Sequence, residues 1–329
     1  MTNSHFVKRI AVLTSGGDAP GMNAAIRSAV RTAIYNKLEV YGVRRGYAGL
    51  IDGDFLSLQA RSVSNIITEG GTILKTSRCE EFKSKEGQKK AVAQLKKRKI
   101  DGLVVMGGNG SFKGAHKLAA DWGIRVVGVP GTIDNDITGT DYTIGADTAV
   151  NTALDAIDKI RDTVHSMERI FIVEVMGRKE GFIAIRVGLT GGAEDIIVPE
   201  TEYNIEDMCD DIREGRKKGK ISWIIVLSEG VAPAEDVAGL IRENTGFEVR
   251  SITLGHVQRG GSPTAMDRLL GLRLGAAAVE ALIKGATDKM AGVERDAIVL
   301  TDFETACRHS RRKSDLDREL YKLTKTLSI

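Results

Sequence analysis

The seven residues at positions 130–136, PGTIDND, follow the apolar run 126–129, which is typical of a buried strand. In an extended or turning backbone, residues two apart point the same way, so Asp134 and Asp136 are expected to face one pocket. Two neighbouring negative charges repel and perturb each other's pKa. The pair therefore needs a counter-cation, and the basic residues that could supply one lie elsewhere in the chain.

Two glycine turns follow other predicted strands. Residues 16–21 (GGDAPG) match the first half of a P-loop, but Met22 and Asn23 replace its Lys and Ser/Thr, and the spacing also fails the dinucleotide pattern. Residues 107–111 (GGNGS) place three glycines around one polar side chain. Glycine lets a backbone approach a ligand closely, and a following helix N-terminus attracts anions. A phosphate or metal site competes with a plain tight turn at both places.

Arginines form a third group. Arg169 precedes a predicted strand and Arg178 follows the end of the same strand. Arg250 begins another strand, and Arg259 belongs to the glycine-containing turn 255–261. Each alone is more typical of a surface salt bridge. Together with strand ends and glycines, they indicate that some converge on a phosphate, which arginine grips with paired hydrogen bonds.

Two more polar residues accompany the arginines. His256 is either an ordinary loop histidine or a phosphate donor, and Glu229 either caps a helix or accepts hydrogen bonds from a sugar hydroxyl. Carboxylates, glycine turns and arginines together suit phosphoryl transfer to a hydroxyl. A carboxylate takes the proton, a divalent metal bridges phosphates, and arginine stabilises the developing charge.

Strands and helices are predicted to alternate along the chain. The strands are 8–14, 39–43, 55–59, 103–106, 124–129, 169–175, 196–199, 223–227, 249–254 and 297–300. The helices are 22–35, 63–69, 87–98, 112–120, 146–161, 181–189, 205–218, 234–244 and 264–284, and 46–53 is expected to be a loop. Such alternation predicts a parallel sheet covered on both faces, with ligands beyond the carboxyl ends of its strands. The unusual sequences all lie at those ends.

Composition limits the class of protein. The chain has 329 residues, enough for about two domains, and its net charge of +3 does not indicate nucleic-acid binding. Three dispersed cysteines fit neither a disulfide framework nor a zinc site, which favours a reducing cytoplasm. Residues 1–5 lack a signal-peptide core, and no apolar run approaches the roughly 18 residues of a membrane span.

Five stretches resemble the bacterial-type ATP-dependent 6-phosphofructokinases, in the same order and over essentially the whole chain. They are 14–27 (TSGGDAPGMNAAIR), 130–136 (PGTIDND), 139–145 (GTDYTIG), 173–178 (VEVMGR) and 254–263 (LGHVQRGGSP). The resemblance implies an α/β fold of two doubly wound, mostly parallel three-layer domains with the active site in the cleft between them. It implies a larger ATP-binding domain (1–144 and 257–306) and a smaller sugar-phosphate-binding domain (145–256 and 307–329).

The resemblance also implies Mg-ATP-dependent phosphorylation of fructose 6-phosphate at its 1-hydroxyl, a step of glycolysis. Asp134 would be the general base, flanked by Thr132 and Asp136, and Arg178 would stabilise the transferring phosphoryl group. Mg²⁺ would lie near Asp136 and Asn109. The residues implied to form the ATP site are Gly17, Arg78, Cys79, Gly108, Asn109, Gly110 and Ser111. Those implied to bind the sugar phosphate are Thr132, Ile133, Asp134, Arg169, Met176, Gly177, Arg178, Glu229, Arg250, His256 and Arg259.

Partners follow from the same resemblance. Arg169 and Arg250 would reach the site of a neighbouring subunit, which implies a homotetramer. An effector site for ADP or phosphoenolpyruvate would use Arg27, Arg31, Arg161, Glu194, Lys218 and Lys220. Asp54 stands where the family has an arginine, so we expect it to repel an anionic effector. Gly110 and Gly131 replace the Asp and Lys of pyrophosphate-dependent relatives, which favours ATP because nothing fills the space for its α-phosphate.

Three departures from the family pattern stand near these sites. Asn109 replaces an aspartate that binds magnesium, and an amide oxygen still binds Mg²⁺ but without the charge a hard cation prefers. Residues 179–182 (KEGF) and 164–168 (VHSME) also differ. Two hypotheses follow: an active kinase with weaker metal binding, or a low-activity paralogue that binds nucleotide and sugar phosphate as a regulatory subunit.

Overall fold

The computed structural model describes residues 7–308 and 311–327, so the predictions for residues 1–5 and for the chain's last two positions lie outside the described part. The chain forms two compact units. Unit 1 comprises 1–148 and 259–310, and unit 2 comprises 149–258 and 311–329. Each crossing lies a few residues later than expected. The assignment of ATP to one unit and sugar phosphate to the other stays a prediction.

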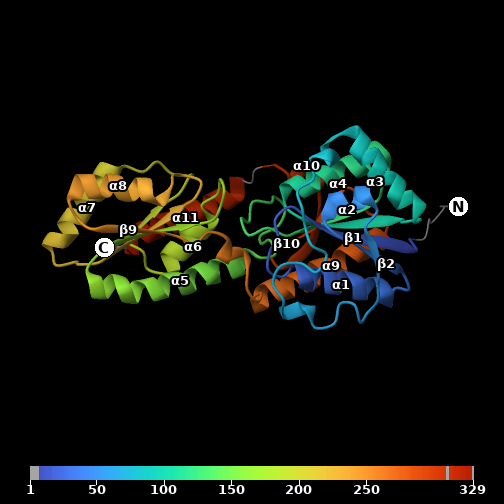
Figure 1. Ribbon diagram of the computed structural model, residues 1–329, viewed down its shortest axis with the longest axis horizontal. Coiled ribbons are helices and arrows are strands. Elements are labelled where there is room, and N and C mark those ends of the chain that lie inside the picture. The colour runs from blue at the N-terminus through green and yellow to red at the C-terminus, as the bar shows by residue number, and fades with distance from the viewer. Residues whose placement is uncertain (1–6, 309–310, 328–329) are drawn as a thin grey trace. The chain divides into compact units, whose positions relative to one another are not determined.

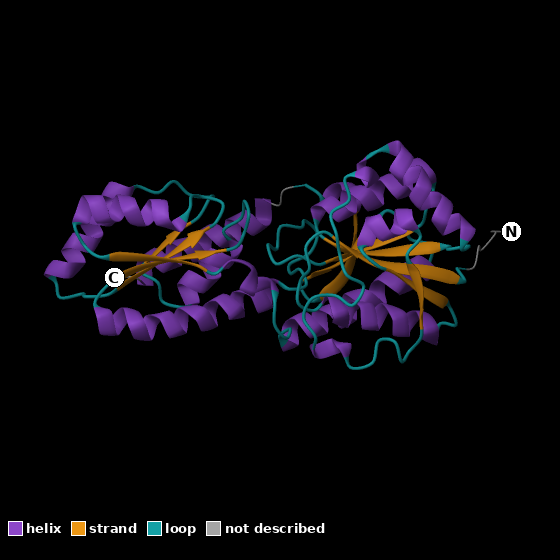
Figure 2. Cartoon of the chain, in the orientation of Figure 1, coloured by secondary structure: helices purple, strands orange, loops and turns teal. Residues whose placement is uncertain are grey.

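Unit 1 is built on a seven-stranded sheet, and Figure 2 shows helices on both of its faces. The strand order is β11-β10-β5-β4-β1-β2-β3. The strands are β1 (Arg9–Ser15), β2 (Glu39–Val43), β3 (Phe55–Leu58), β4 (Gly102–Gly107), β5 (Val126–Pro130), β10 (Lys289–Glu294) and β11 (Ala297–Asp302). The inner strands pair in parallel, whereas β3 and β11 pair antiparallel at the two edges.

The two faces of this sheet bury different helices (Figure 1). Helices α1 (Met22–Tyr35) and α9 (Ala265–Ile283) share one apolar core with the 3₁₀ turn at Ile66–Thr68. The other face packs against α2 (Gly46–Asp52), α3 (Lys85–Lys97), α4 (Asn109–Trp122), α10 (Phe303–Ala306) and the 3₁₀ turn Glu81–Lys83. Strand β4 is buried throughout because both of its faces are covered, as expected for a central parallel strand.

Unit 2 has a four-stranded, wholly parallel sheet in the order β7-β8-β6-β9. The strands are β6 (Ile170–Val175), β7 (Asp195–Ile197), β8 (Trp223–Ser228) and β9 (Val249–Thr253). Helices α7 (Ile205–Lys217) and α8 (Ala234–Thr245) cover one face (Figure 1). The remaining helices of the unit are α5 (Ala146–Met167), which begins in unit 1, α6 (Phe182–Thr190) and α11 (Arg311–Leu327).

The expected α/β fold class with mostly parallel sheets is confirmed. Several elements differ from prediction. Residues 46–52 form helix α2 instead of a loop, and only 66–68 of the predicted helix 63–69 is helical, as a 3₁₀ turn. Strand β10 was not predicted because Gly292 interrupts its apolar pattern; it forms a hairpin with β11 through Arg295 and Asp296, which both have positive φ. None of the described helices is long and apolar enough to cross a membrane.

Candidate active site

The carboxyl ends of three adjacent strands meet at one edge of the unit 1 sheet. Ser15 at the end of β1 pairs in register with Gly107 at the end of β4, and Gly107 pairs with Pro130 at the end of β5. Gly131 N also donates to Gly107 O at 3.0 Å. Both glycine turns and the stretch 130–136 therefore start from the same row of backbone. We call this row and the turns that leave it the catalytic edge.

The two glycine turns are joined directly. The hydroxyl of Ser111 donates to Ser15 O at 2.8 Å and is buried, and Thr76 Oγ1 donates to Gly16 O at 2.7 Å. The predicted turn 107–111 is shorter than expected, because helix α4 already begins at Asn109. Ser111, which we expected in the ATP site, thus uses its side chain to hold the two turns together.

Asn109 contacts Asp136 across the edge. Asn109 Nδ2 donates to Asp136 Oδ2 at 2.8 Å and to Asp136 O at 3.3 Å. The other amide atom, Asn109 Oδ1, is buried and has no hydrogen-bond partner among the described residues. A buried acceptor without a donor is costly, so this oxygen is available to a cation or water.

Asp134 lies in a turn that the backbone fixes. Its side chain is only 3% exposed, and its N–H donates to Thr132 Oγ1 at 3.3 Å. Asn135 has a left-handed φ of 50°, so the alternation of an extended backbone does not hold between Asp134 and Asp136. Ile133 is fully buried. The prediction that both carboxylates face one pocket therefore no longer follows from the spacing of the two residues.

The other predicted ATP residues differ in their surroundings. A side chain at Gly17 would meet the guanidinium of Arg259 at 2.5 Å, and Arg259 Nη1 donates to Asp18 O at 3.1 Å. A side chain at Gly110 would meet nothing within 4 Å, whereas one at Gly131 would meet Met22 Cε at 2.8 Å. The space beside Gly110 agrees with the prediction that nothing fills the place of the ATP α-phosphate. Beside Gly131, however, the side chain of Met22 already occupies the space that a side chain would take. Among the rest, Gly108 is the N-cap of α4, Arg78 is exposed, and Cys79 is partly buried.

In unit 2, the turn after β6 is held by side chains from two other segments. Glu229 Oε1 accepts from Arg178 N at 2.9 Å and from Gly177 N at 3.3 Å, and Gln258 Oε1 accepts from Met176 N at 3.3 Å. Arg178 has a left-handed φ of 55°, a strained conformation that these contacts sustain. Its side chain, like that of His256, is exposed. Sequence reasoning named His256 and missed Gln258, which is fully buried.

Arg169 and Arg250 lie at the opposite edge of the same sheet. Arg169 precedes β6 and Arg250 is the second residue of β9, so both stand at the amino ends, whereas Arg178 follows the carboxyl end of β6. Six residues of strand separate these edges by roughly 20 Å. Both guanidinium groups bind Glu248, at 2.8 Å from Arg169 Nε and 2.6 Å from Arg250 Nη2. Although desolvation opposes it, these bonds hold the pKa of Glu248 below its ordinary value.

The predicted effector residues divide between the units. Arg27 and Arg31 lie one turn apart on α1, and burial together with the charge of Arg31 lowers the pKa of Arg27. Arg161 and Glu194 line a cavity of about 480 Å³ in unit 2. Lys220 Nζ lies 3.4 Å from Glu194 Oε1, and Lys218 Nζ lies 3.6 Å from Glu214 Oε2.

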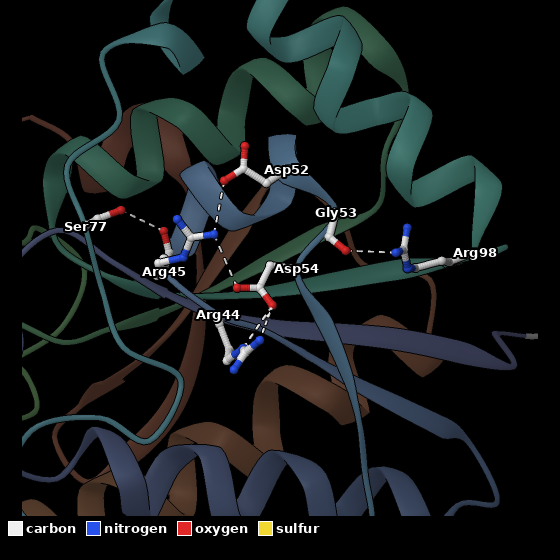
Figure 3. A network of polar contacts seen from close by, with 7 residues as sticks. All are labelled: Arg44, Arg45, Asp52, Gly53, Asp54, Ser77 and Arg98. Carbon is white, nitrogen blue, oxygen red and sulfur yellow. Dashed lines mark hydrogen bonds and ion pairs between the residues drawn. The ribbon is translucent and has the colours of Figure 1, made fainter.

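Asp54 is neutralised by its neighbours (Figure 3). Its carboxylate lies 2.7 Å from Arg44 Nη2 and 3.3 Å from Arg45 Nη2, and Arg45 also binds Asp52 at 3.1 Å. Hydrogen bonding from Arg44 holds the pKa of Asp54 below its usual range. Two arginines balance two aspartates here, so Asp54 belongs to an ion-pair network, and its expected repulsion of an anionic effector stays a prediction.

Comparison with known proteins agrees with these features. A family model described as phosphofructokinase matches residues 9–282. An ATP-dependent 6-phosphofructokinase from Thermoanaerobacter sp. (strain X514) is 53% identical over 324 residues, which cover 98% of this chain and 100% of that one. A protein of the same name from Halalkalibacterium halodurans is 54% identical over 323 residues, with the same coverage. This chain belongs to the phosphofructokinase family.

Solved structures of this family share the fold. The phosphofructokinase from Saccharomyces cerevisiae matches with a TM-score of 0.86 and 33% identity over 97% of this chain. This chain spans 48% of the yeast chain's length. The pyrophosphate-dependent phosphofructokinase from Marinobacter aquaeolei matches with a TM-score of 0.81, covering 96% of this chain and 92% of that one. Its identity is only 23%, so this likeness shows the fold alone.

Proposed function

We propose that this phosphofructokinase-family chain transfers the terminal phosphoryl group of ATP to the 1-hydroxyl of fructose 6-phosphate. Relatives more than half identical over their whole length carry the name ATP-dependent 6-phosphofructokinase, and they do not favour the regulatory paralogue. The structural observation that supports the proposal is the catalytic edge. It places the buried carboxylate of Asp134 after the strand next to a glycine turn that opens a helix.

Asp134 acts as the general base. It accepts the proton of the 1-hydroxyl while that oxygen bonds to the γ-phosphorus, and the bond from phosphorus to the leaving ADP oxygen breaks. Thr132 keeps the turn in place through its hydroxyl, which accepts the N–H of Asp134. General base catalysis of this kind contributes about 10²–10⁴-fold to the rate.

The residues present fit a magnesium ion. Asn109 Oδ1 is a buried oxygen without a donor, and Asp136 beside it supplies a carboxylate, so both offer the hard oxygen ligands that Mg²⁺ prefers. In the described part of the chain, no three His, Cys, Asp or Glu side chains group closely enough to hold a metal. Phosphate oxygens and water would complete the shell. When bound, the ion neutralises charge on the β- and γ-phosphates.

Unit 2 supplies recognition of the sugar phosphate. The exposed guanidinium of Arg178 stabilises the charge of the transferring group, and Met176, Gly177, Glu229 and His256 hold the sugar. Glu229 does so while its Oε1 holds the backbone of Arg178, which leaves Oε2 for a hydroxyl. Arg169 and Arg250 grip the 6-phosphate together with Arg259, which belongs to unit 1.

The position of these arginines supports a homo-oligomer. Arg178 and the Arg169–Arg250 pair stand at opposite edges of one parallel sheet, about 20 Å apart. One sugar phosphate cannot contact both edges of the same sheet. We infer that Arg169 and Arg250 complete the site of a neighbouring copy in a homotetramer. We place this homotetramer in the cytoplasm.

An anionic effector such as ADP or phosphoenolpyruvate is expected to use the divided effector set. Arg27 and Arg31 present like charges on one face of α1, and Arg161 lies in the unit 2 cavity with Glu194. A nucleoside diphosphate needs basic groups for its phosphates and a hydrogen-bond acceptor for its hydroxyl or base N–H groups. The arginines and Glu194 of this set supply both.

A coupled assay for fructose 1,6-bisphosphate tests the function. The rate of product formation by the purified protein is measured with ATP as donor and, separately, with pyrophosphate as donor, at increasing Mg²⁺ concentrations. We expect rapid product formation with ATP but not with pyrophosphate, at a rate that saturates as the Mg²⁺ concentration rises. Binding of both substrates without turnover, or turnover with pyrophosphate alone, would overturn the proposal.

A further inference from the structure

A buried carboxylate outside the predicted site is tied to the catalytic edge. Asp267, in the first turn of α9, is only 1% exposed. Its Oδ1 accepts from Gly145 N at 2.8 Å, and its Oδ2 accepts from Thr148 N at 2.8 Å and from Thr148 Oγ1 at 2.5 Å. Burial raises the pKa of Asp267, and these hydrogen bonds oppose that effect. Burying such a group is costly, so its contacts matter to the fold.

Of the two residues that Asp267 holds, Thr148 lies in the first turn of α5, and Gly145 ends a short strap, 143–145, beside the stretch 130–132. Ile144 N donates to Pro130 O at 3.0 Å, and Thr132 N donates to Ile144 O at 3.1 Å. Thr143 Oγ1 donates to Thr132 O at 2.6 Å, and Gly131 forms a parallel bridge with Ile144. Every backbone polar group of Thr132 is therefore bonded to the strap.

The first glycine turn packs on the same strap. A side chain at Gly21 would meet Ile144 Cγ2 at 2.8 Å and Asp267 O at 3.1 Å. A side chain at Gly145 would meet Ala19 Cβ at 2.6 Å. The strap thus packs closely against the turn and is hydrogen-bonded to the stretch that leads to Asp134.

We propose that Asp267 is a positioning residue for phosphoryl transfer, which sets the Asp134 turn by fixing Gly145 and Thr148. The order of contacts runs from Asp267 to Gly145, along the strap to Thr132, and from the Thr132 hydroxyl to Asp134 N. This inference rests on the proposed function for its kinetic consequence. Its structural consequence, the coupling of residue 267 to the backbone at 132, is independent of the substrate.

The variant Asp267→Asn tests the coupling while keeping the size of the side chain. An amide has one acceptor oxygen, so its NH₂ group must face either the Gly145 or the Thr148 donor. Misplacement of a reacting group by about 1 Å costs on the order of 100-fold in rate. We expect kcat to fall by about 10- to 100-fold. The KM values for ATP and fructose 6-phosphate should change by less than about threefold, because the hydrogen bonds of the strap run to Thr132 and not to the arginines proposed to grip the sugar phosphate.

Asp317→Asn is the matched control. Asp317 is also buried, at 6% exposure, and pairs with Arg186 Nη1 at 2.8 Å, but it lies in α11 of unit 2. We expect this control to lower the unfolding temperature without changing kcat per folded molecule. An equal loss of kcat in both variants would overturn the proposal, because general destabilisation would then explain it.

Hydrogen exchange distinguishes this proposal from the function it rests on. In Asp267→Asn, the amides of Thr132 and Ile144 should exchange at least several times faster than in the wild type, whatever the substrate. Thr148→Val, which removes one of the three donors, should show a smaller change in the same direction and serves if Asp267→Asn does not fold. Unchanged exchange at Thr132, or faster exchange with wild-type kcat, would contradict the positioning role.

Discussion

Two groups of predicted site residues, one in each unit, are held in opposite ways. At the catalytic edge of unit 1, Asp134 is 3% exposed and its turn is bonded to backbone on both sides. In unit 2, the Arg169 and Arg250 side chains are 24% and 57% exposed and are held by one shared carboxylate, Glu248. Backbone contacts leave little rotamer freedom, whereas exposed ion pairs are weak and screened by salt. Under the proposed function, fixed geometry would serve the chemistry, and solvent-exposed charge would serve recognition.

Replacing Asp134, the proposed base of unit 1, should have the largest effect on the rate. Asp134→Asn keeps the size of the side chain but removes the proton acceptor, so kcat should fall by about 10²–10⁴-fold. The KM for fructose 6-phosphate should stay close to that of the wild type, because the arginines that recognise it are untouched. Steady-state kinetics with the coupled assay checks both values. A kcat within tenfold of the wild type would contradict the assignment of the base.

Removing one arginine should have a smaller effect, on binding rather than on chemistry. Arg250→Ala loses a charge-assisted hydrogen bond worth about 1.5–3 kcal/mol, so the KM for fructose 6-phosphate should rise by about 10- to 100-fold. Raising the salt concentration should increase the KM of the wild type more than that of the variant, because fewer charges remain to be screened. Arg213→Ala, on the exposed face of α7, is a control for loss of surface charge.

Asn109 offers a test of the metal argument that does not depend on activity. Asn109→Asp would place a second carboxylate where the amide now donates to Asp136 at 2.8 Å. Without Mg²⁺, repulsion should lower the unfolding temperature by a few degrees, and millimolar Mg²⁺ should restore it by binding the folded state. The wild-type unfolding temperature should respond less. Equal responses to Mg²⁺ in both proteins would show that position 109 does not contact the ion.

The smallest effect is expected at Asp54. Because Arg44 lowers the pKa of Asp54, its stabilising contribution is present above the unfolded pKa of about 3.9 and is lost as pH falls through the lower folded value. Asp54→Asn should therefore reduce stability at pH 7 by less than about 1 kcal/mol, with the difference vanishing at acid pH. Denaturant unfolding at pH 7 and at pH 3 measures it. A large gain in effector affinity in Asp54→Asn would support the repulsion argument.

Much of the fold followed from hydrophobic patterns, and the exceptions have physical causes. Helix α1 and strand β2 agree with their predicted bounds because their apolar periods are clear. Helix α2 was missed because three glycines among eight residues indicate a loop, while Tyr47 and Leu50 bury it against the sheet. Helix α11 was not predicted because its polar sequence has low mean hydropathy, and ion pairs such as Arg186 with Asp317 contribute to its packing.

For the site, residue types were more predictable than their contacts. The motifs identified Asp134, Asn109 and Arg178 together with Thr132, Asp136 and Glu229, which contact them, but not Asp267 or Gln258, because those two partners are distant in sequence from the residues that they hold. Asp267 lies 119 residues from Thr148, and Gln258 lies 82 residues from Met176. Glu248 was also missed, since an acid between two predicted phosphate-binding arginines gives no signal of its own.

One measurement tests directly whether Asp134 of one subunit acts together with Arg250 of another. Asp134→Asn and Arg250→Ala proteins are mixed, unfolded and refolded together so that subunits exchange, and activity is compared with each parent refolded alone. Activity is read at a fructose 6-phosphate concentration well below the KM of Arg250→Ala, because that variant is expected to lose binding and keep its kcat. If Arg250 serves a neighbour's Asp134, about a quarter of the sites in random hybrids carry both residues intact, and activity then rises well above both parents. Activity equal to the mean of the parents would show that both residues act within one chain, which would contradict the account.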